Sequence, residues 1–333
     1  MHKQSLLAII IIALIGILVY FNSLDNSFVW DDKDLIVENP LIKNWTHLGD
    51  IFKKDLFYVA PEKSFYYRPI QSLSYVLDYS IYRLKPKGYH IANISIHILN
   101  AVLIYFLILA FTKNKIVSFC ASAVFVVHPV YTSAVTYISG RGELLVTLFL
   151  LASFLLFIRC KNFNNPWQIF LYLLSLICYV CSLLSKESAL LIPFLFLIYL
   201  LVFEYQNKKQ ILLMKISPIF LISIIYIGLR FYILKFKATV LPVTSLTLWQ
   251  RFLLWFKTLA LYAKLLFAPF HLHMERSIVV PKNMFQPQVM IGILFLIGAP
   301  GSLIINEGTA KFRNEFLCYV IFNSFRYLTS SIV

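Results

Sequence analysis

Residues 28–32, Phe28-Val29-Trp30-Asp31-Asp32, follow the first long apolar run of the chain, which covers residues 6–22. Two adjacent carboxylates therefore stand about ten residues past an apolar segment, where a membrane-spanning helix reaches the water interface. A charged group at such a boundary costs free energy unless it is solvated or paired, so a functional role is favoured. Aspartates are also common in turns and helix caps, and that purely structural role is the alternative.

The composition of the whole chain supports a membrane protein. Hydrophobic residues make up 60% of the 333 residues and charged residues only 14%, whereas a soluble domain carries roughly 25% charge. The sequence therefore predicts an all-α polytopic membrane protein. The formal net charge of +15 does not indicate a nucleic-acid partner, because many basic residues lie in short loops between apolar runs. Such loops orient the spans and contact the headgroups of membrane lipids.

Eight apolar runs are candidates for membrane spans. They cover residues 6–22, 90–112, 116–136, 143–158, 167–184, 188–203, 216–234 and 288–299. Residues 248–270 are also apolar but contain Arg251, Lys257 and Lys264, which fall near one face of a helix. Because each charge inside the bilayer costs on the order of 2.5–3.5 kcal/mol, we expect an amphipathic helix in the membrane interface there.

The distribution of lysine and arginine orients these spans. One side, expected to be cytoplasmic, receives the basic residues near the first span and in alternate loops: Lys3, Lys113, Lys115, Arg159, Lys161, Lys208, Lys209 and Lys215. The opposite side then receives residues 23–88 and the turns around Arg141 and Lys186. The sequence thus predicts a multi-pass protein of a bacterial cytoplasmic membrane, or of the endoplasmic reticulum membrane in a eukaryote, with its active site facing away from the cytoplasm.

The first loop, residues 23–88, is expected to be folded and functional. It holds most of the acidic residues of the chain, namely Asp25, Asp31, Asp32, Asp34, Glu38, Asp50, Asp55, Glu62 and Asp78. Thr46 is a candidate cap for a helix with apolar positions Leu48, Ile51 and Phe52. Pro69 is a candidate first residue of a second helix that aligns Ile70, Leu73, Leu77 and Ile81 on one face. Both helices are expected to lie on the membrane surface.

Asp31 and Asp32 are the candidate catalytic pair. One carboxylate can remove the proton of an acceptor hydroxyl during attack on an activated sugar carbon. The other can orient the acceptor, or the two can share a divalent cation such as Mg²⁺ or Mn²⁺ that holds a leaving phosphate. No cofactor is required by the sequence itself.

Basic and polar motifs on the same predicted side are candidates for substrate binding. Arg68 offers planar donors that match phosphate, and Tyr67 offers an aromatic face. His128 precedes a proline that breaks the third span. The remaining candidates are Arg141 with Glu143 in a charged turn, Lys186 with Glu187 in a second turn, and Glu275 with Arg276. Each has a structural alternative: an interfacial anchor for Tyr67 and Arg68, a kink for His128, and solvated turns with local ion pairs for the others.

Taken in order over about residues 5–280, these motifs resemble the GT-C superfamily of membrane glycosyltransferases, in particular the transmembrane and tetratricopeptide-repeat O-mannosyltransferases and their prokaryotic homologues. The resembling stretches are Phe28–Asp32 with Asn39-Pro40, Tyr67-Arg68-Pro69, His128-Pro129-Val130 with Gly140–Glu143, Ser185-Lys186-Glu187, and Leu265–Pro269 with Glu275-Arg276. The tetratricopeptide repeats of many relatives are absent from this sequence, and Glu275-Arg276 stands where relatives often carry an aspartate.

The resemblance implies a GT-C-like bundle of about 8–10 transmembrane helices with a large first extracytoplasmic loop. It also implies transfer of a mannose-like sugar from a polyprenyl-phosphate donor to a protein or glycan acceptor. Asp31 would be the general base and Asp32 its partner, with Arg68, Arg141 and Lys186 contacting the donor phosphate.

This glycosyltransferase domain is expected to cover residues 1–298, followed by an atypical tail of residues 299–333. The alternatives are a non-catalytic partner in lipid-linked glycan assembly, such as a flippase, and an inactive truncated homologue.

Overall fold

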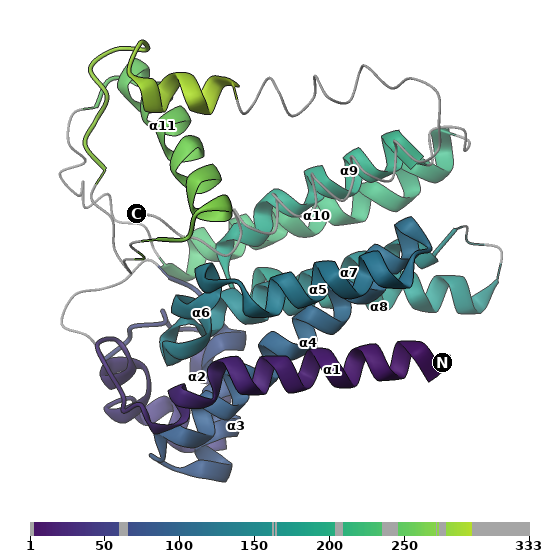
Figure 1. Cartoon of the computed structure of the whole chain (residues 1–333). Coiled ribbons are helices and arrows are strands. Elements are labelled where there is room, and N and C mark those ends of the chain that lie inside the picture. Colours follow the sequence, from purple (N-terminus) through teal and green to yellow (C-terminus); the bar gives the residue numbers. More distant parts are fainter. Residues whose placement is uncertain are drawn as a thin grey trace. The chain divides into compact units, whose positions relative to one another are not determined.

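The computed structural model describes residues 3–59, 66–161, 163, 165–203, 209–234, 246–270, 272 and 278–294. These residues form helices and loops and no strand, which confirms the predicted all-α polytopic fold class (Figure 1). Two compact units are present. Helices α1 to α10 belong to the first, which contains the acidic loop, and α11 (Leu248–Phe267) belongs to the second. The predicted tail of residues 299–333 lies outside the described residues.

Five described helices are long and apolar enough to cross a membrane. They are α1 (Lys3–Tyr20) with its extension to Asp25, α4 (Pro86–Thr112), α7 (Arg141–Arg159) with the preceding turn, α8 (Pro166–Leu183) and α10 (Lys209–Leu234) over Leu212–Ile233. A sixth span forms if α5 (Lys115–Val127) is counted together with the segment Pro129–Thr136. The two parts are bent by 47° at His128, which confirms the predicted break there.

The described residues therefore contain fewer spans than the expected 8–10. The run at 188–203 forms a short turn, Glu187–Leu191, followed by α9 (Ile192–Phe203) of 12 residues. At 1.5 Å per residue, α9 covers about 18 Å, which is less than the bilayer core. The last run, 288–299, is described only to residue 294. For α11, a Thr247–Gln250 capping box fixes the start of the predicted amphipathic helix.

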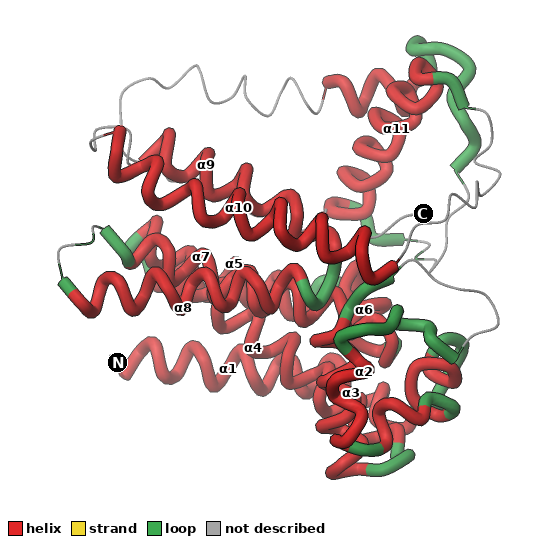
Figure 2. The backbone as a smooth tube through the Cα atoms, turned by 180° about the vertical axis from the view of Figure 1, so that it is seen from behind, coloured by secondary structure: helices red, strands yellow, loops and turns green. Residues whose placement is uncertain are grey.

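Short elements of the first unit gather at one end of the long helices, and the N-terminus lies at the other end (Figures 1 and 2). The turn between α4 and α5 lies at the N-terminal end, since Lys115 Nζ donates to Gln4 Oε1 at 2.9 Å. The opposite end holds residues 21–59 and 66–68, α3 (Pro69–Tyr82), α6 (Thr132–Thr136) and the turn before α9, which are joined by the bonds described below. The basic loops and the acidic loop are thus separated along the bundle.

Both helices predicted in the first loop are present, with one correction. Helix α2 (Leu48–Ile51) is a single turn, and Asn44 rather than Thr46 caps the turn that precedes it, by accepting from Thr46 N at 3.1 Å. Asn44 has the extended backbone that a cap requires, whereas Thr46 is already helical. Helix α3 begins at Pro69 as predicted.

The apolar stripe of α3 is mostly exposed, because Leu77 and Ile81 are 52% and 63% accessible. The buried face of α3 carries the polar and aromatic side chains of Gln71, Tyr75 and Asp78, together with Val76. An exposed apolar stripe with a polar inner face is consistent with a helix on the membrane surface. The inner face of α3 is what positions the site.

Candidate functional site

The Asp31-Asp32 motif forms a tight turn that is fixed by its own backbone. Val29 N donates to Asp32 Oδ2 at 3.0 Å, and Asp32 N donates to Val29 O at 3.0 Å. Trp30, at the corner, has a φ of 47°, in the left-handed region that bulky side chains rarely occupy. The turn continues into one π-helical turn, Lys33–Val37.

Asp32 is held from a second element 107 residues away. Its Oδ1 accepts from both the backbone N and the side-chain Oγ of Ser139, the former at 2.9 Å. The carboxylate is fully buried. Burial raises the pKa of Asp32, and the hydrogen bonds from Ser139 and Val29 oppose that shift. Asp32 is therefore an anchor whose two oxygens are both occupied by protein donors.

Asp31, by contrast, is exposed. The Asp31 carboxylate acts on Tyr137, whose pKa is raised, first by burial and then by the negative charge of Asp31. The Tyr137 ring also packs edge-on against Trp30, with centroids 6.2 Å apart. The two adjacent aspartates thus occupy opposite environments: Asp32 fixes the turn and Asp31 is available to a substrate.

The sequence suggested that Arg141 lies in a surface turn, but its side chain lies in the interior of the protein. The side chain is 1% exposed and forms an ion pair with Asp78 of α3 at 2.5 Å. Its Nε donates to Asn93 Oδ1 at 2.7 Å, and another guanidinium nitrogen donates to Tyr89 O at 3.0 Å. The local reason is that the turn Ile138–Gly140 runs directly into α7, which places Arg141 in the first turn of that helix. Arg141 joins α7 to α3 and α4.

Glu143, Lys186, Arg68 and Glu187 form two neighbouring ion pairs. Lys186 Nζ pairs with Glu143, and Arg68 donates to both oxygens of Glu187 at 2.8 and 3.1 Å. Glu143 also acts electrostatically on Arg68, and Lys186 on Glu187, so the four groups form one charge cluster. The pairs are therefore long-range and not local to the Lys186 turn. Burial opposes ionisation of Glu187, but the bonds and charge of Arg68 outweigh it and hold the pKa of Glu187 below its usual value.

The candidate cations of this site differ in how far their side chains are exposed to solvent. The side chain of Arg68 is 12% exposed, whereas Lys186 and Arg141 are almost completely buried. The guanidinium of Arg68 also lies 4.5 Å from the centre of the Tyr66 ring. Arg68 is thus the cation of the cluster that an incoming phosphate can reach with the smallest rearrangement.

Two further candidates have structural contacts. Tyr67 is buried and its hydroxyl donates to Phe52 O at 3.0 Å, which ties the loop to the start of α3. His128 is half-buried, and its Nδ1 accepts from Val130 N at 3.3 Å after the break in the helix. Glu275 and Arg276 lie outside the described residues.

The sequence reasoning missed the polar face of α4. His90, Asn93, His97 and Asn100 are all buried and share one side of this span. Asn93 donates to the carbonyls of Val135 and Tyr137, and Asn100 donates to Leu144 O at 3.0 Å. Their spacing of three and four residues is the signal that could have identified them. Asn93 in particular satisfies carbonyls of the broken region and so holds the loop that carries Ser139.

The residues present fit a divalent cation poorly. No group of three or more His, Cys, Asp or Glu side chains that could hold a metal occurs in the part of the chain that the structure describes. Both oxygens of Asp32 accept hydrogen bonds from the protein, so Asp31 would be a single carboxylate ligand. We derive no chemical step through a metal.

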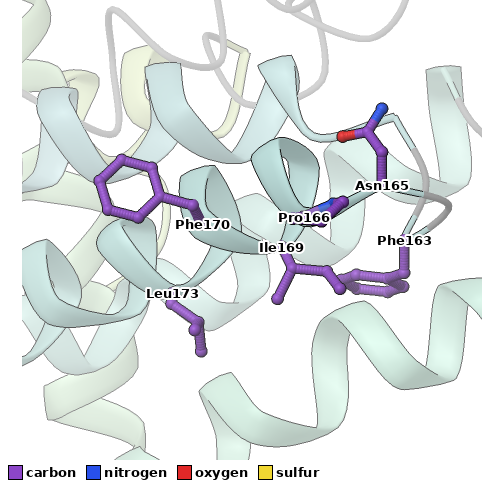
Figure 3. A pocket seen from close by; sticks show the side chains of 6 residues that line it. All are labelled: Phe163, Asn165, Pro166, Ile169, Phe170 and Leu173. Atoms are coloured by element: carbon purple, nitrogen blue, oxygen red, sulfur yellow. The ribbon is translucent and has the colours of Figure 1, made fainter.

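A groove of about 330 Å³ lies at the start of α8, at the other end of α7 from the Asp31 turn (Figure 3). It is lined by Phe163, Asn165, Pro166, Ile169, Phe170 and Leu173. The polar member, Asn165, accepts from Gln168 N and caps α8. Its lining carries no group that could act as an acid, a base or a nucleophile.

Comparison with known proteins confirms the resemblance. The chain is 32% identical over 199 residues to a protein O-mannosyl-transferase of Caenorhabditis elegans, which covers 57% of this chain and 27% of that protein. It is 39% identical over 150 residues to human protein O-mannosyl-transferase TMTC3, and this match covers 44% of this chain and 16% of that protein. It is 31% identical over 225 residues to human protein O-mannosyl-transferase TMTC2, and this match covers 62% of this chain and 26% of that protein.

The chain thus spans about a quarter or less of the length of the curated relatives it matches. No family model matches the chain, and no solved structure matches it.

Proposed function

We propose that this relative of the TMTC protein O-mannosyl-transferases is itself a membrane glycosyltransferase. It would move a mannose-like sugar from a polyprenyl-phosphate donor to a protein or glycan acceptor on the non-cytoplasmic side. The observation that carries the proposal is the different environment of two adjacent carboxylates, one anchored and one exposed. The names of the relatives support the reaction class.

In the proposed reaction, Asp31 removes the proton from an acceptor hydroxyl while the hydroxyl oxygen attacks C1 of the donor sugar. The bond between C1 and the phosphate oxygen breaks, and its electron pair leaves with the polyprenyl phosphate. Asp32 acts through position only, since its bonds to Ser139 and Val29 fix the backbone that presents Asp31. A general base of this kind contributes roughly 10²–10⁴-fold to a rate.

The donor phosphate would be bound by Arg68, the most accessible cation of the charge cluster. Arginine presents two parallel donors to a phosphate, and the bidentate pair with Glu187 shows that this geometry is available. Lys186 would add positive charge behind Arg68. Arg141, with its buried contacts to Asp78 and Asn93, would position the loop without touching the donor.

The test compares Asp31→Asn with Asp34→Asn in membranes supplied with a short-chain polyprenyl-phosphate mannose and an acceptor mixture. We expect Asp31→Asn to lower transfer by about 10²-fold or more without lowering the unfolding temperature, because Asp31 is exposed. Asp34, three residues further along the same turn, is the matched control and should retain transfer. Equal transfer by wild type and Asp31→Asn would overturn the assignment of the base.

A further inference from the structure

Trp30 occupies an unusual place for a large aromatic residue. Its backbone is in the left-handed region, with a φ of 47°, and its side chain is 64% exposed. Strained residues of this kind persist where the surrounding structure holds them, and they concentrate at binding and catalytic sites. Here the hydrogen bonds between Val29 and Asp32 close the turn from both sides of Trp30. The turn thus holds an exposed indole directly beside the exposed Asp31.

Tyr137 completes an aromatic corner around the same carboxylate. Its ring meets the Trp30 ring at an angle of 75°, with centroids 6.2 Å apart. The phenol oxygen is buried within reach of the Asp31 carboxylate and the Ser139 hydroxyl, without a hydrogen bond of good geometry to either. Its backbone is fixed, since Tyr137 O accepts from Asn93 Nδ2 at 3.2 Å and from Gly140 N at 3.0 Å. The phenol of Tyr137, the carboxylate of Asp31 and the indole of Trp30 therefore lie around one place.

This combination matches the chemistry of a pyranose ring. One face of a pyranose presents C–H groups that are attracted to the negative face of an aromatic ring, while its rim carries hydroxyl groups. The hydroxyls can donate to a carboxylate such as Asp31 and accept from a phenol such as that of Tyr137. The side chain of a serine or threonine is too small to cover an indole face, so a sugar fits this corner better than an amino acid does.

We propose that Trp30 and Tyr137 form a sugar-binding subsite beside Asp31, in which a pyranose ring lies against the Trp30 indole and hydrogen-bonds to Tyr137. The inference rests on the proposed glycosyltransferase function and deepens it. The ring can be that of the donor sugar or that of a sugar on a glycan acceptor, and kinetics distinguish the two.

The experiment uses the full chain in lipid nanodiscs with Trp30→Gly, Trp30→Phe and Tyr137→Phe variants. Glycine accepts the left-handed backbone without strain, so Trp30→Gly removes the indole while keeping the turn, and its unfolding temperature should not fall. Trp45→Phe is the matched control, because Trp45 is an exposed tryptophan of the same loop whose Nε1 donates to Ser80 Oγ at 2.8 Å. The probes are methyl α-mannopyranoside and a short-chain polyprenyl-phosphate mannose.

Saturation-transfer NMR with methyl α-mannopyranoside should show contact to the ring protons in wild type and in Trp45→Phe, and loss of that contact in Trp30→Gly. We expect Trp30→Gly to raise the KM of either the donor or the acceptor by about tenfold. Trp30→Phe and Tyr137→Phe should raise the same KM by less. An increase in the KM of the lipid-linked donor alone assigns the ring to the donor. An increase in the KM of a glycan acceptor alone assigns it to the acceptor.

Two outcomes separate this inference from the proposed function. If wild type transfers mannose and Trp30→Gly matches it in both KM values and in the NMR contacts, the subsite is wrong and the function stands. If wild type transfers no sugar but its contact to the mannoside disappears in Trp30→Gly, the function is wrong and the sugar subsite stands.

Discussion

The guanidinium of Arg141 is surrounded by partners from two other helices. It contacts Asp78 and Ser74 on α3, and Asn93 and the Tyr89 carbonyl on α4, and it lies 4.7 Å from the centre of the Tyr75 ring. Burying a charge costs several kcal/mol unless a partner and hydrogen bonds compensate it. All of these contacts depend on the fork geometry of arginine, which a lysine cannot reproduce.

We therefore predict that Arg141→Lys lowers the free energy of unfolding by about 2 kcal/mol and that Arg141→Met lowers it by about 3–5 kcal/mol. Thermal unfolding in detergent would measure both. Arg159→Lys is the control, since Arg159 is exposed at the other end of the same helix, and it should change stability by less than about 0.5 kcal/mol. Equal effects of the two lysine variants would show that the buried contacts of Arg141 do not stabilise the fold.

At the scale of single residues, the sequence drew attention to individual side chains but could not show their contacts. The Asp31-Asp32 pair stood out because its position relative to an apolar run is local information. Arg141 also stood out, but its partner Asp78 lies 63 residues earlier, so the motif itself could not show that the charge is buried and paired. Ser139 carried no signal, because a serine in a turn is common and its bond to Asp32 exists only in the folded chain.

The turn between α6 and α7 is the element on which the site depends. It carries Tyr137 and Ser139 and leads directly into Arg141, and α3 holds it through Gln71, which donates to Ser139 O at 3.0 Å. A Cβ added at Gly140 would lie 2.8 Å from Ser133 O and 3.0 Å from Ala134 Cα, both backbone atoms. A Cβ at Gly142 would lie 2.6 Å from Gln71 Oε1, the end of a side chain, and at an ordinary contact distance of 3.6 Å from Ser185 O.

Alanine at these two glycines should therefore have different effects. Gly140→Ala pushes against backbone that cannot move independently, and we expect it to cost about 1–3 kcal/mol of stability. Gly142→Ala can be relieved by a small shift of Gln71 Oε1, the end of a flexible side chain, and should cost less than half as much. Because the turn presents Ser139, Gly140→Ala should also lower sugar transfer. Unfolding curves of the two variants, measured side by side, provide the check, and a larger loss for Gly142→Ala would contradict this account.

The link between α3 and the turn before α9 should depend on acid pH. The pKa of Glu187 is lowered in the folded protein, because the bonds and charge of Arg68 outweigh the opposing effect of burial. A lowered carboxyl pKa stabilises the fold at pH values above the unfolded pKa of about 4.3, and this contribution disappears as the pH falls through the lower folded value. The ion pair should therefore matter at pH 7 and not in strong acid.

The measurement is the difference in unfolding temperature between wild type and Glu187→Gln. It should be clearly positive at pH 7 and shrink as the pH falls below about 4. Glu38→Gln serves as the control, because Glu38 is an exposed glutamate of the first loop, and this change should leave the unfolding temperature nearly unchanged at pH 7. A difference for Glu187→Gln that stays constant down to acid pH would show that the ion pair does not stabilise the fold.

Across the whole molecule, the apolar runs predicted the spanning helices well, because hydrophobic length is a direct requirement of the bilayer. The break at His128-Pro129 was also predictable from proline chemistry. The length of α9 was overestimated from the sequence. The turn Glu187–Leu191 precedes α9 and contributes Glu187 to the charge cluster, so it does not extend the helix. The buried polar face of α4 was overlooked because a hydropathy average over 27 residues conceals four polar side chains.

The arrangement of the two ends of the bundle leads to a test of topology. The described part of the first loop and the turns at Arg141 and Lys186 meet at one end, where Asp32, Ser139 and the ion pairs lie. The basic loops containing Lys115 and Lys161 lie at the other end, with the N-terminus. Short loops rich in lysine and arginine remain on the cytoplasmic side, so the Asp31 site should face away from the cytoplasm.

Single cysteines at Lys33 and Lys161, both exposed, would report the two ends once the five native cysteines are replaced. We predict that an impermeant maleimide labels Lys33→Cys in intact cells and labels Lys161→Cys only after lysis. The reverse pattern would place Asp31 on the cytoplasmic side, where a donor would have to be presented from the inner leaflet. Labelling of both positions in intact cells would contradict a single orientation. Lys33 follows Asp32, which bonds to Ser139 just before α7, and Lys161 follows the C-terminal end of α7. One experiment therefore fixes the orientation of the site and of the reaction it would carry out.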